Sequence, residues 1–190
     1  HSTHRSLTGI MSKFDWTQLN LPSRALLSLA GALLVAACAG QNTALYQPSP
    51  EDLAAQAPDS FLVDIETSEG TLTVKMRRHW SPAAVDRIWH LMDNNFYAGA
   101  RVYRMVDGFV AQWGYSGDPA RDSAWRANPL DDEPVLGSNV QGTVSFARAG
   151  PRTRSFQLFI NLGDNDRLDG FASGGVVGYP PIGEIEEGED

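Results

Sequence analysis

The stretches VYRMVDGFVAQWG, residues 102–114, and GTVSFARAGPRTRSFQLFI, residues 142–160, decide the fold of this chain. In both, short runs of apolar and polar residues end at glycine or proline, a pattern typical of half-buried β-strands. Each stretch also carries one or more arginines and one glutamine. We therefore expect two strand pairs, each placing a cation, an amide and several large apolar groups on a shared face.

Working outward from these stretches, more strands and one helix are predicted. Residues 61–67 and 71–76 alternate in the same way around a turn at Glu69-Gly70, which predicts a hairpin. Ser81-Pro82 favours a helix start, and the helix is expected to end near Asn94-Asn95. Residues 116–139 are predicted to form a long loop, and residues 142–148, 158–162 and 182–185 further strands. One early helix among many short strands indicates a mainly β fold, a closed antiparallel barrel capped by a helix.

Several motifs in order resemble the cyclophilin family of peptidyl-prolyl cis-trans isomerases. They are Arg104 followed after three residues by Gly-Phe and then by Gln112, Phe-Ala-x-Ala-Gly-Pro at 146–151, Gln-x-Phe-Ile at 157–160, and Leu-Asp-Gly at 168–170. The resemblance runs from about Phe61 to the last residue. It implies the cyclophilin barrel. A second capping helix and a last strand normally follow in that family, so we expect both to be missing here.

The resemblance also implies an activity and a set of site residues. Arg104 matches the arginine that hydrogen-bonds the prolyl nitrogen, and Gln112 matches the glutamine that orients the substrate carbonyl; we take both as catalytic. The residues expected to bind substrate are Phe109, Val110, Ala147, Arg148, Ala149, Gln157, Phe159, Leu168 and Tyr179. The implied reaction, isomerisation of X-Pro bonds, requires neither a metal nor another cofactor.

Some positions depart from the family pattern. Arg148 stands where asparagine is common, and only its backbone is expected to pair with substrate. Arg167 replaces a tryptophan, Tyr179 replaces a histidine, and residues 171–178 contain an insertion of about seven residues relative to the resemblance. The insertion, Trp113 in place of a small residue and the missing C-terminal elements leave an alternative function open: a proline-peptide-binding or chaperone-like module without catalysis.

The N-terminal part indicates export. Residues 25–37 form an apolar run of about 13 residues, shorter than the roughly 20 that a spanning helix needs. The run ends in Val-Ala-Ala-Cys38, which resembles a bacterial lipoprotein signal with Cys38 as the lipidated residue. An amphipathic helix with a chance cysteine is the other interpretation. We therefore expect residues 1–37 to be upstream residues and a signal peptide, 38–60 a tether, and 61–190 the cyclophilin-like domain.

Charge and cysteine content restrict the partners. The chain holds 15 Lys and Arg against 23 Asp and Glu, a net charge of −8. Phosphate binding needs a surplus of basic residues, so nucleic acid is not expected as a partner. Cys38 is the only cysteine, so no intrachain disulfide can form. The expected partners are proline-containing polypeptides and, through the lipid anchor, a membrane of the bacterial cell envelope; we expect a monomer facing the periplasm.

Overall fold

The fold is mainly β, as the strand patterns predict. A computed structural model describes residues 4–7 and 43–186 of the chain. In chain order, its elements are β1 His4–Leu7, α1 Thr43–Tyr46, α2 Pro50–Leu53, β2 Ser60–Thr67, β3 Gly70–Arg77, the 3-10 turn η1 Arg78–Trp80, α3 Pro82–Asp93, β4 Arg104–Val106, β5 Val110–Trp113, α4 Pro119–Arg126, β6 Thr143–Phe146, β7 Leu158–Asn161, η2 Asp166–Leu168, β8 Ala172–Ser173, β9 Val176–Val177 and β10 Pro181–Ile185.

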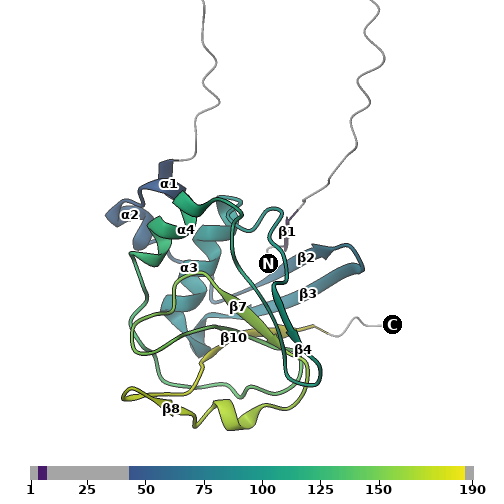
Figure 1. The fold of residues 1–190 in the computed structure, drawn as a ribbon. Helices are drawn as coiled ribbons and strands as arrows, with labels where there is room; N and C mark the ends of the chain where they lie inside the picture. Colours follow the sequence, from purple (N-terminus) through teal and green to yellow (C-terminus); the bar gives the residue numbers. More distant parts are fainter. Residues whose placement is uncertain (1–3, 8–42, 187–190) are drawn as a thin grey trace, which may run out of the picture. The chain divides into compact units, whose positions relative to one another are not determined.

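Eight of these strands form one sheet in the order β1-β2-β3-β10-β6-β7-β5-β4 (Figure 1). Every pair is antiparallel except β1 with β2, which is parallel. The pairing among the described strands is open, with β1 and β4 at the two ends, so the predicted closed barrel is corrected. Alternation of apolar residues identifies strands, but closure depends on which edge strands meet. Here the outer edge of β2 pairs with residues 4–7, which lie upstream of the predicted domain.

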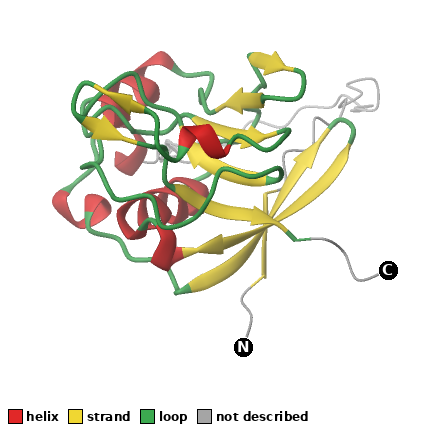
Figure 2. Ribbon diagram, turned by 90° about the horizontal axis from the view of Figure 1, so that it is seen from below, coloured by secondary structure: helices red, strands yellow, loops and turns green. Residues whose placement is uncertain are grey.

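The buried core lies between the sheet and α3, which Figure 2 shows beside the strands. Val85 and Ile88 of α3 share one buried cluster with Val74 of β3 and Ile160 of β7. The predicted hairpin is confirmed as β2–β3, in which Thr67 pairs with Gly70. The predicted helix is confirmed as α3.

The start of α3 is capped by a different residue from the one predicted. The Ser81 side chain makes no capping bond to the helix. Instead Glu133 accepts a hydrogen bond from the Ala83 backbone N–H at 2.8 Å and another from the Ser81 hydroxyl. A carboxylate at a helix N-terminus is favourable because backbone N–H groups there lack partners. The loop at 116–139 therefore stabilises α3, and it also contains α4, a helix that the sequence analysis missed.

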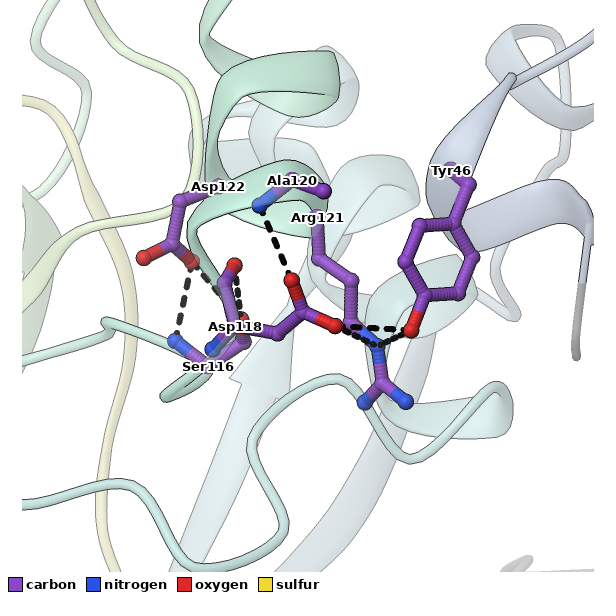
Figure 3. Close-up of polar contacts among 6 residues, drawn as sticks. All are labelled: Tyr46, Ser116, Asp118, Ala120, Arg121 and Asp122. Atoms are coloured by element: carbon purple, nitrogen blue, oxygen red, sulfur yellow. Dashed lines mark hydrogen bonds and ion pairs between the residues drawn. The ribbon is translucent and has the colours of Figure 1, made fainter.

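Part of the segment predicted as a tether, residues 38–60, packs onto the domain. Leu45 of α1 is 1% exposed and belongs to a second buried cluster. The Tyr46 hydroxyl donates to Asp118 Oδ2 at 2.7 Å, and Arg121 Nε donates to the Tyr46 oxygen at 3.1 Å (Figure 3). Both partners belong to the start of α4. Helix α1 is therefore held by the apolar contact of Leu45 and by the polar contacts of Tyr46.

The predicted signal peptide and Cys38 lie outside the described residues. Within residues 4–7 and 43–186, no helix combines the length and the apolar character required to cross a bilayer.

Candidate active site

Arg104, Gln112 and Phe159 form one row across three neighbouring strands. Arg104 of β4 lies opposite Gln112 of β5, and Gln112 lies opposite Phe159 of β7. Residues directly opposite each other in an antiparallel pair project from the same face of the sheet. Their sequence neighbours Ala111 and Leu158 belong to the buried core. Strand alternation therefore directs this row to the face away from the core.

The Arg104 guanidinium lies beside an amide and an aromatic ring. Its Nη1 is 3.4 Å from Gln112 Oε1, and its Cζ is 5.7 Å from the centre of the Phe109 ring. Arg167, from η2, places its Cζ 4.9 Å from the same ring centre. Two cations thus face the Phe109 ring, an arrangement that the negative potential of an aromatic face stabilises. The structure brings Arg104, Gln112 and Phe109 together, as the sequence motif predicts.

The other predicted apolar residues lie in the row itself, next to it in β5, or in contact with it. Phe159 is 5% exposed and packs edge-to-face on Tyr179, with 5.8 Å between the ring centres. Val110 is 3% exposed, so its side chain is almost covered by the protein itself. The half-buried Leu168 accepts a backbone hydrogen bond from Tyr179 at 3.1 Å, which links these two predicted residues. The predicted apolar residues therefore occupy one region, in which Phe159 and Tyr179 touch.

A network of buried asparagines holds the backbone beneath these rings. Asn165 Nδ2 donates to the Phe109 carbonyl at 2.8 Å and to Asn161 Oδ1 at 2.9 Å. Asn139 Nδ2 donates to the Tyr179 carbonyl at 2.8 Å. All three asparagines are at most 4% exposed. Sequence reasoning missed them; the one available signal is Asn161 within a strand, where asparagine is uncommon.

Gln157 has its amide occupied by two tyrosines. The Tyr103 hydroxyl donates to Gln157 Oε1 at 2.7 Å, and Gln157 Nε2 donates to the Tyr115 oxygen at 3.3 Å. Burial raises the pKa of Tyr103 above its usual value, so this hydroxyl keeps its proton at neutral pH. Gln157 precedes Phe159 by two residues, so these two hydrogen bonds fix its amide next to the row.

The loop that follows β6 contains the three remaining predicted residues. The backbone N–H of Ala147 donates to the Gln157 carbonyl at 2.9 Å, and that of Ala149 donates to Thr153 Oγ1 at 2.9 Å. Arg148, expected to act through its backbone, uses its side chain: Nε donates to the Gly178 carbonyl at 3.0 Å. The structure thus assigns Arg148 a side-chain role that the resemblance did not imply.

The chemistry available to this arrangement is electrostatic. A charged donor and an amide lie beside apolar and aromatic side chains, which suits a ligand that combines an amide group with an apolar ring. Among residues 4–7 and 43–186, no cluster of three or more His, Cys, Asp and Glu residues could hold a metal ion.

Comparison with known proteins identifies the family. The family model described as "Cyclophilin type peptidyl-prolyl cis-trans isomerase/CLD" matches residues 62–190. A peptidyl-prolyl cis-trans isomerase of Acinetobacter baylyi is 29% identical over 140 residues, which cover 73% of each chain. Peptidyl-prolyl cis-trans isomerase-like 3 of Mus musculus is 32% identical over 133 residues, covering 66% of this chain and 76% of its own.

Solved structures agree on the fold. A cyclophilin-type isomerase of Cryptosporidium parvum superposes with a TM-score of 0.52 at 22% identity, over 66% of this chain and 76% of its own. Cyclophilin AquaCyp293 of Hirschia baltica also has a TM-score of 0.52, at 16% identity, over 72% of this chain and 70% of its own. The chain therefore belongs to the cyclophilin-type family of peptidyl-prolyl cis-trans isomerases.

Proposed function

We propose that this peptidyl-prolyl cis-trans isomerase twists X-Pro bonds with Arg104 as the charged donor and Gln112 as the group that orients the substrate carbonyl. The observation that carries the proposal is the cross-strand row of Arg104, Gln112 and Phe159. This row places a cation, an amide and an aromatic side chain on one face of the sheet.

The physical basis is the stabilisation of a twisted amide. Rotation about the peptide C–N bond has a barrier of about 18–20 kcal/mol because the bond has partial double-bond character. In the twisted state the prolyl nitrogen becomes pyramidal and accepts a hydrogen bond. A donor aimed at that nitrogen binds the transition state more tightly than the planar ground state, which lowers the barrier. Arginine suits this role because it stays charged and presents rigid donors.

The proline ring would contact the apolar side chains of the same region. Phe109, Phe159, Leu168 and Tyr179 offer aromatic and aliphatic surface, and burial of such surface contributes about 25 cal/mol per Å². A related isomerase of Cryptosporidium parvum was solved in the presence of the dipeptide Ala-Pro. This supports a proline-containing peptide as the ligand of the present chain.

Exchange NMR on a proline tetrapeptide tests catalysis against binding alone. We expect the protein to broaden or exchange the cis and trans signals at catalytic concentrations, and tryptophan fluorescence to show saturable peptide binding. Saturable binding with an isomerisation rate equal to that of buffer would instead establish the non-catalytic module. Absence of both would remove the proposed site.

We further propose that the isomerase is a monomer anchored through a lipidated Cys38 to a membrane of the bacterial envelope, where it assists folding of periplasmic proteins. The support is the apolar run that ends at Cys38. Replacement of Cys38 by serine should move the protein from the membrane fraction to the soluble fraction. Retention of the Cys38→Ser variant in the membrane would contradict lipid anchoring at this residue.

A further inference from the structure

The insertion after Leu-Asp-Gly forms a small hairpin, β8–β9, beside the site. Ala172 pairs with Val177 and Ser173 with Val176. The two residues between the strands are Gly174 and Gly175, with φ of +62° and +90°. Positive φ at both positions gives the tight two-residue turn whose twist matches that of a hairpin. The insertion is therefore an ordered element with a defined turn.

Arg148 braces the base of this hairpin. Its Nε donates to the Gly178 carbonyl at 3.0 Å, and its Nη2 is 3.3 Å from both the Phe171 and Val176 carbonyls. The same guanidinium lies over Tyr179, with Cζ 4.6 Å from the ring centre. One rigid cation thus ties three hairpin carbonyls to a predicted proline-site ring.

The tip of the hairpin lies against the loop that follows β6. A methyl group at Gly174 would be 2.9 Å from Cδ of Pro151, so the turn lies directly against that proline. Pro151 is in the same loop as Ala149, one of the residues expected to receive the substrate backbone. The hairpin is therefore held at both ends beside the expected path of a bound peptide.

The hairpin exposes apolar side chains next to the site. Phe171 is 51% exposed and Val177 is 56% exposed. The Phe171 ring centre is 6.3 Å from that of Tyr179, which in turn packs on Phe159. A continuous series of aromatic rings thus leads from the buried Phe159 to the exposed Phe171. Exposed aromatic surface that continues a binding site is suited to contact with the same ligand.

We propose that the β8–β9 hairpin forms an additional apolar subsite, which favours peptides carrying an aromatic or large aliphatic side chain next to the proline. Phe171 contacts that side chain, and Arg148 is a positioning residue that keeps the hairpin in place. This inference rests on the proposed function, because the subsite is defined by its continuity with the proline site.

The test compares tetrapeptides that differ in one residue flanking the proline, alanine or phenylalanine on either side. Isomerisation is followed by exchange NMR, and kcat/KM for each phenylalanine peptide is divided by that for the alanine peptide. The wild-type protein should favour one of the phenylalanine peptides by about tenfold, the scale of discrimination for an apolar contact. Phe171→Ala and Arg148→Ala should each bring this ratio close to one.

The ratio of the two kcat/KM values within one variant is independent of the fraction of folded protein. If Arg148 contributed only to global stability, Arg148→Ala would therefore leave this ratio unchanged. Arg148→Lys should recover little of the preference, since an ammonium group cannot span three carbonyls. Arg152→Ala serves as the control: this exposed arginine of the same loop pairs with Asp131, and its loss should keep the wild-type ratio.

Two results would overturn the proposal in distinguishable ways. A wild-type ratio near one, or an unchanged ratio in Phe171→Ala, with turnover of the alanine peptide intact, would remove the subsite and leave the proposed function standing. Failure of the wild-type protein to accelerate any of the peptides would contradict the proposed function and the subsite together.

Discussion

At the scale of single residues, the charged groups of this chain are placed by specific neighbours. Arg104 and Arg167 both face Phe109, although they come from β4 and η2. The motif around Arg104 predicts the first contact, because Arg104 lies in β4 and Phe109 lies in the turn that leads directly into β5. The second contact depends on the tertiary position of η2, so local sequence gives no signal for it.

His90 is expected to make the stability of the folded protein depend on pH. It lies in α3, is largely buried, and has Nε2 3.8 Å from Asp52 Oδ1 of α2. Burial lowers the pKa of His90 below its usual value of 6.5, more than Asp52 raises it. The unfolded chain therefore binds a proton near pH 6.5, while the folded protein binds it only at lower pH. The contribution of neutral His90 to the free energy of unfolding is thus fully present above pH 6.5. It is lost as the pH falls through the lower pKa of the folded protein.

Thermal unfolding measured between pH 7.5 and 5.5 checks this prediction. His90→Gln should flatten the fall in melting temperature as the pH decreases. His79→Gln, at an exposed position outside α3, is the matched control variant. An equal slope in wild type and His90→Gln would show that His90 is not the titrating group.

At the scale of elements, the docking of α1 predicts a measurable contribution to stability. Leu45 is buried with Leu91 and Trp125, so Leu45→Ala should reduce the free energy of unfolding by about 2–4 kcal/mol through lost contacts and a cavity. Leu53→Ala in α2 is the matched control, because Leu53 is 39% exposed and its loss should cost far less. Equal urea midpoints for the two variants would mean that α1 does not pack as described.

Elements with a regular pattern could be predicted, and those set by distant partners could not. Hairpin β2–β3 and helix α3 follow from alternation and from Ser81-Pro82. Helix α4 was missed, although Asp118 caps it and Pro119 opens it, because its mean polarity resembles that of a loop. The asparagine network and the Arg148 brace act on backbone carbonyls far along the chain, which no local pattern reveals.

At the scale of the whole molecule, the site depends on one edge of the sheet. Arg104 lies in β4, the end strand of the described sheet, and only β5 pairs with it. An edge strand lacks a second neighbour to hold its register. The contacts of Arg104 with Gln112 and Phe109 therefore rest on the β4–β5 pair, whose strands are joined by the three-residue turn Asp107-Gly108-Phe109.

The net charge of −8 is likewise a property of the whole molecule. It gives no surplus of basic residues for phosphate, and the proposed substrate group, a prolyl amide, is neutral. The motif order alone was enough to locate Arg104, Gln112 and Phe109 in the chain. The common face of Arg104 and Gln112 could be established only from the strand register, and the position of Phe109 only from its contact with Arg104.

The central claim is that the Arg104 guanidinium stabilises the twisted prolyl amide, and kcat/KM of Arg104→Ala tests it most directly. Removal of one charged donor should lower kcat/KM for a proline tetrapeptide by about 10²-fold, with the fold retained by circular dichroism. Arg101→Ala, which removes the same charge from an exposed position nearby, should keep wild-type activity. An Arg104→Ala variant as active as the wild-type protein would contradict the account.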